Sequence, residues 1–372
     1  MNALREKIEQ EIRDRGPIPF SRYMELCLYD RELGYYSRNA EQFGKAGDFY
    51  TSSDVHAVFG RLMARQFEEM WRALDRPAKV TVREFGSGRG LFAKDVLDWS
   101  AKTFPDLFAA MRYVLIENSP ALRQRIEATL SPHLESGKAE LASEAGPSEA
   151  FPTIVFANEF FDALPVEIVS AQGSLRVDVG DRRFTEGWAP PSAEELEFLD
   201  RYSVHPEAGE RVEAALQAQA AMNCAASSDR GFMVVIDYGY TRQEQLADRH
   251  RGTLKAIRRH SVSGNPYEAP GEQDITADVN FTALAAAAES RGWHAEKLIT
   301  QSQFLMGIGE ANQFADAFQD CRLPQERTKV ALQLKHLVTP AGMGESFHVM
   351  LASKGADPAK VARLAGLSFG RR

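Results

Sequence analysis

The chain has 372 residues, of which 44% are hydrophobic and 26% charged, and its formal net charge is −8. This is the composition of an ordinary globular protein with room for one large or two medium domains. The acidic balance argues against nucleic acid as a partner, because phosphate binding needs a basic field. The three cysteines are far apart and form no CxxC pair, which indicates neither a disulfide framework nor a metal site.

The sequence shows no sign of membrane insertion or export. It has no run of 18 or more apolar residues, so we expect no membrane span. Residues 1–15 carry charges of both signs and lack the apolar core of a signal peptide or the features of a transit peptide. We therefore expect a cytoplasmic protein if the source is bacterial, and the oligomeric state stays open.

Alternating apolar strands and helices predict an α/β fold with a seven-stranded, doubly wound, Rossmann-like sheet. The first five predicted strands are 80–85, 112–117, a weaker 138–142, 153–157 and 231–237, and helices are expected at about 90–103 and 119–130. Further on, strands are predicted at 294–300 and 346–352, with helices at 281–291 and within 302–338. We expect an antiparallel pair of strands to close the sheet at its edge.

Three other parts surround this core, which we place at 76–165 and 231–352. A mainly helical region, 1–75, is expected to pack on the core, and an inserted α+β subdomain spans 166–230. Within the insertion we predict a meander of strands at 166–171, 174–179 and 182–188, followed by helices at about 193–202 and 207–223. The stretch 239–280 is loop-rich and too long for a simple connection, and the polar tail 353–372 is expected to be frayed.

The glycine-rich turn after the first predicted strand indicates a ligand. Glu84 ends the strand, and Gly86, Gly88 and Gly90 follow at every second position. The dinucleotide fingerprint G-x-G-x-x-G places its third glycine one residue later. The alternating pattern looks instead like the first motif of class I S-adenosylmethionine (SAM) methyltransferases, and an acid at the turn suits the positive sulfonium of SAM. The alternative is a tight connection that binds no ligand.

The second predicted strand ends in another acid, Glu117, which lies where Rossmann-like folds carry the carboxylate that binds ribose hydroxyls. Asn118, beside it, is assigned to the same site. Ser119 and Pro120 are compatible with a second interpretation, in which Glu117 lies at a helix N-terminus with Ser119 as its cap.

A group of polar and aromatic residues follows directly after the fourth predicted strand. Asn158, Glu159 and Asp162 follow it, together with Phe160 and Phe161. Ligands of such folds bind at the carboxyl ends of the strands, so the aromatic side chains could form a pocket wall and the carboxylates could bind a cationic acceptor. The alternative is a turn with solvated acids and core aromatics.

Two more segments have open roles. Asp237 ends the fifth predicted strand, and it either orients a substrate or bonds to a neighbouring loop. Segment 47–54 either forms a lid over the cofactor or begins a helix, because Thr51 and Asp54 have the spacing of a capping box.

Together these segments resemble the MidA-like SAM-dependent methyltransferases, a family that includes the mitochondrial complex I assembly methyltransferase. The resemblance covers nearly the whole chain and is most specific at 157–165 and 271–276. It implies a class I methyltransferase core, SAM as cofactor and methylation of a protein arginine, in the mitochondrial relatives on a respiratory complex I subunit. The SAM-site positions that it implies are Gly47, Thr51, Glu84, Gly86, Gly88, Glu117, Asn158 and Glu159. The chain departs from the usual family pattern at Asp54, Ser87, Asp278, Asn280 and His348, which leaves the substrate open.

The expected reaction is an in-line attack on a sulfonium methyl group, in which the protein mainly positions the reactants. A guanidinium, with a pKa of about 12.5–13.8, is a poor nucleophile. We predict that Glu159 and Asp162 flank it, with Asp237 as a third candidate. Other functions stay open: a SAM-binding assembly factor or chaperone with little turnover, or a methyltransferase acting on RNA or a small molecule. A dehydrogenase is disfavoured by the glycine spacing.

Overall fold

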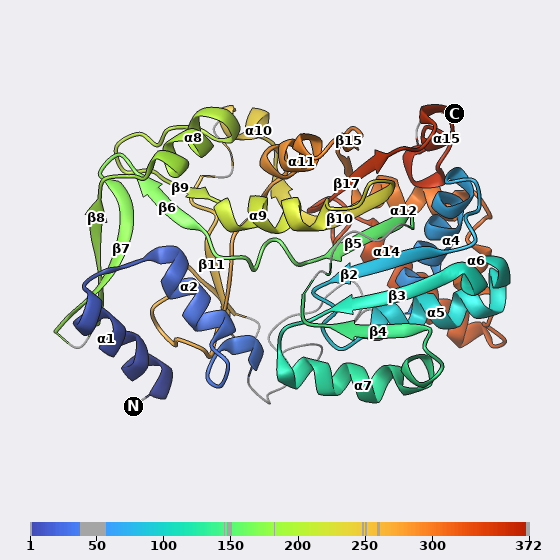
Figure 1. Ribbon diagram of the computed structural model, residues 1–372, viewed down its shortest axis with the longest axis horizontal. Coiled ribbons are helices and arrows are strands. Elements are labelled where there is room, and N and C mark those ends of the chain that lie inside the picture. The colour runs from blue at the N-terminus through green and yellow to red at the C-terminus, as the bar shows by residue number, and fades with distance from the viewer. Residues whose placement is uncertain are drawn as a thin grey trace.

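The computed structural model describes residues 2–37, 57–144, 146, 151–181, 183–247, 249, 251–258 and 261–369. The chain forms two lobes that face each other (Figure 1). The main lobe comprises the described residues of 57–165, 215–240 and 277–369, and the second lobe comprises those of 2–37, 166–214 and 241–276. The predicted N-terminal region 1–75 is therefore shared between the lobes.

The main lobe is built on a twisted sheet whose strand order is β4-β3-β2-β5-β10-β17-β15. These strands are Ala139–Ala142, Met111–Ile116, Val80–Phe85, Thr153–Asn158, Gly231–Tyr240, Phe347–Lys354 and His294–Ala295. Two short strands, β14 (Val279–Asn280) and β16 (Ile299–Thr300), add to β10 and β17. β2, β3, β4, β5 and β10 are mutually parallel and β17 is antiparallel. The predicted doubly wound sheet with a reversed closing strand is confirmed.

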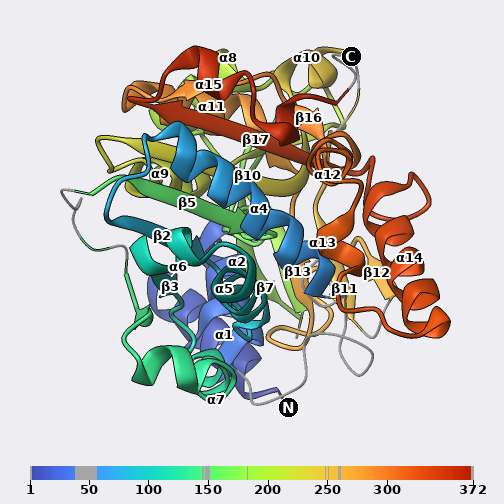
Figure 2. The same ribbon diagram turned by 90° about the vertical axis from the view of Figure 1, so that its right-hand side faces the viewer.

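Helices cover both faces of this sheet. One face packs against α4 (Ala57–Ala73), α5 (Leu91–Thr103), α6 (Pro105–Ala110), α7 (Pro120–Glu135), α12 (Gln301–Glu310), α13 (Ala315–Phe318) and α14 (Pro324–Val338). The other face packs against α9 (Leu216–Ala225) and α11 (Phe281–Ser290). Figure 2 shows α4 crossing the first face, with α14 to one side.

The sequence of β10 shows why both faces are covered. Phe232, Val234 and Ile236 belong to the core on one face, whereas Met233 and Val235 belong to the core on the other. Side chains alternate between the two faces of a strand. A strand without polar residues at either set of positions must therefore be buried on both sides.

The second lobe contains two smaller sheets. The first has the order β1-β7-β6-β9, with β8 on β7, and the second has the order β12-β11-β13. Their strands are Ile18–Pro19, Gly173–Gly180, Glu167–Ser170, Arg211–Ala214, Arg183–Ala189, Ser261–Ser263, Lys255–Arg258 and Asp274–Thr276. The helices α1 (Ala3–Arg15), α2 (Phe20–Tyr29), α8 (Ala193–Tyr202) and α10 (Arg242–Leu246) and the 3-10 turn η1 (Tyr35–Ser37) complete this lobe. The predicted meander within the insertion is confirmed as β6, β7 and β8.

Three predictions of secondary structure need correction. The predicted helix 207–223 is the strand β9 followed by α9, because Val212 and Leu216 have helical spacing although β9 pairs with β6. The loop-rich stretch 239–280 contains β11, β12, β13 and α10, whose strands are too short to show alternation. The predicted strand 294–300 is divided into β15 and β16.

The prediction of a frayed tail is also wrong for its described residues. The tail forms the short helix α15 (Pro358–Val361) and the 3-10 turn η2 (Ala365–Leu367). Val361, Leu364 and Leu367 are buried in the main core, and the N–H of Gly366 donates to Gln66 on α4 at 2.9 Å. A few apolar side chains among polar ones are enough to dock this segment.

We predict that Leu364→Ala lowers the free energy of unfolding by about 2–5 kcal/mol, the usual cost of removing a buried leucine side chain. Leu364 is 2% exposed. The measurement is urea unfolding followed by circular dichroism. Leu332→Ala is the control, because Leu332 is 62% exposed and its truncation should change stability by less than about 0.5 kcal/mol. Equal effects would show that the tail is not docked.

Candidate functional site

A cavity of about 1690 Å³ lies between the lobes and reaches the carboxyl ends of β2, β3 and β5. The chain runs from β2 to β3 on one side and later returns to β5 on the other, so the strand order reverses between β2 and β5. Ligands of doubly wound sheets bind at this reversal. The volume exceeds the roughly 300–1,000 Å³ of a single small-molecule pocket, which leaves room for part of a second molecule.

The glycine turn after β2 forms one wall of the cavity. Its backbone is left-handed at Gly86, Gly88 and Gly90, where φ is 68°, 55° and 74°. Glycine adopts this conformation without the steric penalty of a side chain. At Gly86 space is also missing, because a Cβ atom would lie 2.8 Å from Cδ2 of Phe160. The turn after β2 therefore packs directly against the turn after β5.

Glu84 lies at the base of this turn with a buried carboxyl group. The hydroxyl of Tyr113 donates to its Oε2 at 2.8 Å. Burial raises the pKa of Glu84 to about 8, the hydrogen bond from Tyr113 lowers it, and the nearby Glu117 raises it. A cation bound next to Glu84 would lower this pKa and favour the ionised form.

Glu117 follows β3 and faces the same cavity. Its Oε1 accepts a hydrogen bond from the N–H of Ser119 at 2.9 Å. Burial raises the pKa of Glu117 to about 7, against the effect of the N–H groups of Ser119, Gly88 and Asn118. Ser119 is also the N-cap of α7 and accepts from the N–H of Leu122 at 3.3 Å. The interpretation of Ser119 as a helix cap is therefore confirmed, and the role of Glu117 in binding ribose stays a prediction.

The turn after β5 is strained. Glu159 has a φ of 52°, a left-handed conformation that is uncommon for a residue with a side chain and often occurs at functional sites. The amide of Asn158 donates to Oε1 of Glu159 at 3.0 Å. Among the described residues, Oδ1 of Asn158 is buried without a hydrogen-bond partner. Because buried polar atoms are normally paired, this oxygen points to a ligand.

Asp237 holds that turn in place from below. Its carboxyl group is fully buried. Oδ2 accepts from the N–H groups of Phe161 and Asp162 at 3.0 and 3.3 Å, and Oδ1 accepts from the N–H of Tyr238 at 3.0 Å. Of the two roles left open for Asp237, these contacts favour the bond to a neighbouring loop.

Asp162, like Glu159 of the same turn, lines the cavity between the lobes. Its Oδ2 accepts a hydrogen bond from the hydroxyl of Tyr238, and its Oδ1 is buried without a partner among the described residues. Burial raises the pKa of Asp162 to about 6, against the effect of the hydrogen bond from Tyr238 and of the N–H groups of Ala163 and Asp162, and the carboxylate of Asp278 raises it further. Oδ1 is therefore the oxygen of Asp162 that a bound group could reach.

Two stacked tyrosines form the opposite wall. The rings of Tyr29 and Tyr36 lie 5.6 Å apart at an angle of 26°. The hydroxyl of Tyr29 donates to the carbonyl of Ala163, and that of Tyr36 donates to Oδ1 of Asp274, both at 2.9 Å. Burial raises the pKa of Tyr29, and so do the carboxylates of Asp274, Asp162 and Glu117. The tyrosine pair therefore lies among acids from both lobes.

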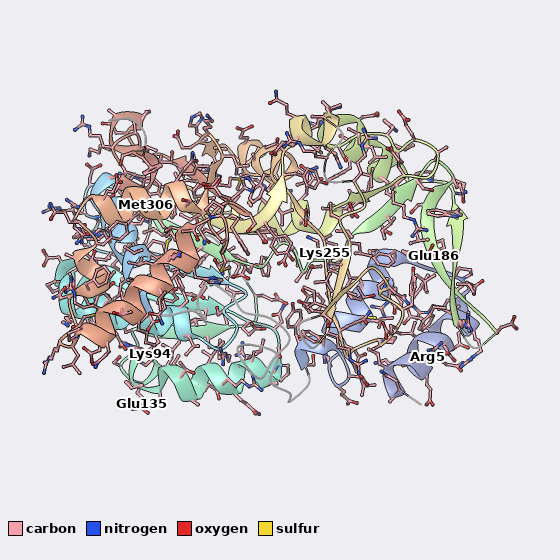
Figure 3. The ribbon with its side chains drawn as sticks, turned by 180° about the vertical axis from the view of Figure 1, so that it is seen from behind. Arg5, Lys94, Glu135, Glu186, Lys255 and Met306 are labelled. Atoms are coloured by element: carbon pink, nitrogen blue, oxygen red, sulfur yellow. The ribbon has the colours of Figure 1, made fainter. Side chains whose placement is uncertain are left out.

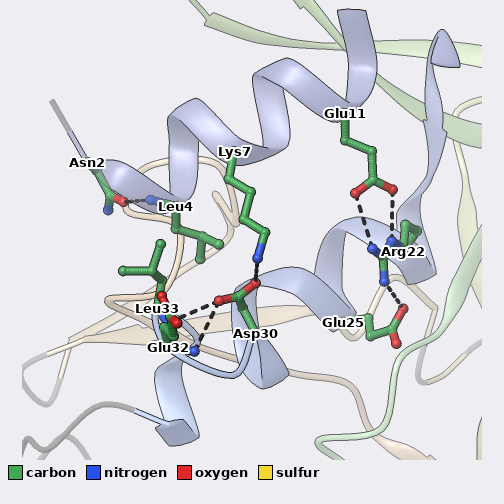
Figure 4. A network of polar contacts seen from close by, with 9 residues as sticks. All are labelled: Asn2, Leu4, Lys7, Glu11, Arg22, Glu25, Asp30, Glu32 and Leu33. Atoms are coloured by element: carbon green, nitrogen blue, oxygen red, sulfur yellow. Dashed lines mark hydrogen bonds and ion pairs between the residues drawn. The ribbon is translucent and has the colours of Figure 1, made fainter. Parts of the chain in front are cut away.

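Ion pairs between α1 and α2 hold this wall (Figure 4). Arg22 binds Glu11 with two nitrogens, at 3.0 and 3.1 Å, and Glu25 with a third, at 2.8 Å. Lys7 pairs with Asp30, which also accepts from two N–H groups of the turn that leads to Tyr36. The Arg22 contacts fix α2 against α1, and those of Asp30 fix the end of α2 at Tyr29 and the turn that leads to Tyr36.

Acidic side chains outnumber basic ones on the described wall of the cavity. The acids are Glu25, Glu84, Glu117, Glu144, Glu159, Asp162, Glu244, Asp274, Asp278 and Glu345, and the lysine and arginine side chains are Arg31, Arg89 and Lys255. Such an excess attracts cations and repels phosphate groups. The cavity therefore suits a cationic ligand better than a nucleotide phosphate.

The predicted site residues have different outcomes. Those that line the cavity are Glu84, Gly86, Gly88, Glu117, Asn118, Asn158, Glu159 and Asp162. Gly47 and Thr51 lie outside the described residues, as does the rest of segment 47–54. Asp237 lies beneath the wall. The sequence reasoning missed Tyr29, Tyr36, Lys255 and Asp274, which the second lobe brings to the cavity.

Residues 62–299 match a family described as "Putative S-adenosyl-L-methionine-dependent methyltransferase". The chain belongs to this family. A crystal structure from Burkholderia thailandensis, bound to S-adenosylhomocysteine, is 30% identical with a TM-score of 0.80, over 97% of this chain and 95% of that one. The chain is thus a SAM-dependent methyltransferase with the class I fold, as the resemblance implied.

Two curated relatives are similar over most of their length. The mitochondrial protein arginine methyltransferase NDUFAF7 homolog of Drosophila melanogaster is 28% identical over 99% of this chain and 88% of its own. The human protein arginine methyltransferase NDUFAF7 is 27% identical over 91% of this chain and 80% of its own.

The cavity of this methyltransferase fits SAM, which supplies a methyl group on a positively charged sulfur when bound. Gly86 and Gly88 line the cavity, Oδ1 of Asn158 can accept from a ligand, and Glu84 and Glu117 offer carboxyl groups for a cation and for hydroxyls. In the described part of the chain, no cluster of three or more His, Cys, Asp or Glu side chains could hold a metal ion. No described helix is long and apolar enough to cross a membrane.

We predict that Gly86→Ala weakens the binding of S-adenosylhomocysteine at least about tenfold, because a left-handed residue with a side chain costs roughly 1–2 kcal/mol and the new Cβ displaces Phe160. Isothermal titration calorimetry measures the affinity. Gly137→Ala is the control, since Gly137 has the same φ of 68° with nothing within 4 Å of its Cβ position. If both variants bind alike, the steric argument fails.

We further predict that affinity for S-adenosylhomocysteine rises with pH through about 7, because the ionised Glu117 accepts hydroxyl hydrogen bonds and its pKa is about 7. Below this value, one competing proton weakens binding by at most about tenfold per pH unit. Titrations at pH 6, 7 and 8 test this expectation. Glu117→Gln should flatten the profile between pH 6 and 7, and an unchanged slope in this variant would assign the effect to another group.

Proposed function

We propose that the chain is a protein arginine N-methyltransferase. Relatives named protein arginine methyltransferases match it over most of its length. The observation that carries the proposal is that Tyr29 lines the cavity together with Asp162 and Asp274, whose carboxylates are close enough to raise its pKa. Carboxylates bind a guanidinium through charge-assisted hydrogen bonds, and aromatic faces attract it.

In this proposal, one end of the cavity holds SAM. Glu117 accepts from the ribose hydroxyls with Asn118 beside it, Gly86 and Gly88 allow close approach to the backbone, and Glu84 and Asn158 complete the contacts. The family resemblance adds Gly47 and Thr51 from the segment outside the described residues.

The other end holds the acceptor, with Glu159 and Asp162 on either side of the guanidinium. Asp237 then acts as a positioning residue, because it fixes the N–H groups of Phe161 and Asp162 rather than touching the acceptor. The left-handed backbone of Glu159 is consistent with a place beside the acceptor, since such a strained conformation persists only where the surrounding structure enforces it.

Methyl transfer to a guanidinium requires that the two reactants are positioned in line and that one group accepts a proton. The attacking nitrogen forms a bond to the methyl carbon as the carbon–sulfur bond breaks, and the nitrogen then loses one proton. Asp162 is suited to accept it, because burial raises its pKa to about 6, above that of an exposed aspartate. The methylated guanidinium keeps its positive charge and its pairing with Glu159.

The class of acceptor to test first follows from the family resemblance, which names a respiratory complex I subunit in the mitochondrial relatives. The cavity has the size for a side chain that reaches the cofactor from a protein bound outside. We therefore propose an arginine on a protein surface or tail as the acceptor.

We predict that Asp162→Asn and Glu159→Gln each lower arginine methylation at least about tenfold, because a hydrogen bond to a charged group contributes roughly 1.5–3 kcal/mol. The measurement is incorporation of tritiated methyl groups from SAM into the proteins of a cell lysate, with mass spectrometry of the labelled arginines. Affinity for S-adenosylhomocysteine, from calorimetry, should stay within about threefold for Asp162→Asn, which leaves the glycine turn intact.

The control is Glu345→Gln, which removes the same charge from an exposed position on the rim of the cavity and should leave methylation nearly unchanged. Full activity in both test variants would refute the acceptor site. Label that ribonuclease removes would indicate RNA methylation, and binding of SAM without any labelled product would indicate a SAM-binding assembly factor.

A further inference from the structure

Lys255 places a positive charge on the acceptor side of the cavity. It begins β11, and Figure 3 shows it on the side of the second lobe that faces the main lobe. Lys255 is the lysine among the described lining residues, and its side chain is 41% exposed. It therefore lies in the space that an acceptor side chain must enter.

The ammonium group of Lys255 is held by an acid and an aromatic ring. It donates to Oδ1 of Asp278 at 2.8 Å and lies 5.1 Å from the ring centroid of Tyr238. The hydroxyl of Tyr238 in turn donates to Asp162. Asp278 and Asp162 are close enough that the charge of one raises the pKa of the other. The ammonium group of Lys255 thus contacts one carboxylate and one ring, and Asp162 is hydrogen-bonded to the tyrosine that carries this ring.

We propose, on the basis of the proposed function, that Tyr238, Asp162 and Asp278 form the subsite for the cationic side chain of the acceptor. Lys255 occupies this subsite until the acceptor's guanidinium displaces it.

The chemistry of the two cations favours this exchange. An ammonium is a compact point charge on a flexible stem, whereas a guanidinium is a planar fork that can donate to two carboxylates and stack on a ring. Lys255 reaches Asp278, while Oδ1 of Asp162 has no described partner. A guanidinium can satisfy both acids and cover Tyr238 at once. A lysine from a substrate has no such advantage over Lys255, so the internal lysine favours arginine over lysine as acceptor.

The subsite is also positioned for methyl transfer. Asp162 belongs to the turn after β5, four residues beyond Asn158, and that turn packs against the glycine turn through Phe160 and Gly86. Tyr238 follows Asp237, which holds the same turn. The proposed cation position therefore shares its support with the proposed cofactor contacts.

The test is the affinity of the full chain, saturated with S-adenosylhomocysteine, for Nα-acetyl-arginine amide and Nα-acetyl-lysine amide, measured by calorimetry. Lys255→Met removes the internal cation and keeps an unbranched apolar stem. It should strengthen binding of the arginine probe by about five- to thirtyfold, the equivalent of one partly buried cation–π contact and ion pair. The same variant should also lower the ratio of the affinity for the arginine probe to the affinity for the lysine probe. Asp278→Asn should weaken binding of the arginine probe.

The matched control is Arg31→Met. Arg31 also lines the cavity, so its loss changes the charge by the same amount and should alter the affinity by less than about threefold through long-range electrostatics alone. Lys255→Gln is the second variant if Lys255→Met does not fold, and unchanged affinity for S-adenosylhomocysteine shows that each variant is intact.

The proposal is overturned if removal of Lys255 leaves the affinity for the arginine probe unchanged, strengthens it no more than Arg31→Met does, or if the probe does not bind at all. Failure of the proposed function gives a different result: the probe responds to Lys255→Met as expected, but no arginine is methylated in the lysate experiment.

Discussion

The site depends on one buried carboxyl group. Asp237 is removed from solvent entirely, and a buried acid must be hydrogen-bonded because the loss of water would otherwise be costly. Its partners are three backbone N–H groups, those of Phe161, Asp162 and Tyr238. By joining the end of β10 to the turn after β5, it fixes where Asn158 and Asp162 lie relative to each other. The geometry of both halves of the cavity follows from this junction.

The two lobes contribute different residues to the cavity because they are built differently. The main sheet brings Glu84, Glu117 and Asn158 together at the ends of three neighbouring strands, where a ligand meets backbone and acids alike. The second lobe is assembled from three separate stretches of chain and contributes Tyr29 from the first and Asp274 from the last of them. Changes in the second lobe can therefore alter its wall of the cavity while the wall formed by the main sheet stays the same.

The sequence was sufficient for the main sheet, because most of its long strands contain a run of apolar residues, and β2 and β3 are followed at once by Gly86 and Glu117. The short strands β11 and β13 contain three or four residues, too few for alternation to be visible. The wall formed by Tyr29 and Asp274 could not be predicted, since no local pattern links residues that only tertiary packing brings together. The docked tail escaped prediction for a related reason: three apolar residues in a polar segment carry its burial.

Tyr36 has a mechanical consequence for the space between the lobes. Its carbonyl accepts from the hydroxyl of Ser119 at 2.6 Å, and its own hydroxyl donates to Asp274. Tyr36 therefore connects the N-cap of α7 in the main lobe to β13 in the second lobe. The length of this one residue sets the distance between the lobes at this point. Widening the cleft at this point breaks one of the two bonds. Together the two bonds therefore oppose a separation of the lobes at this point.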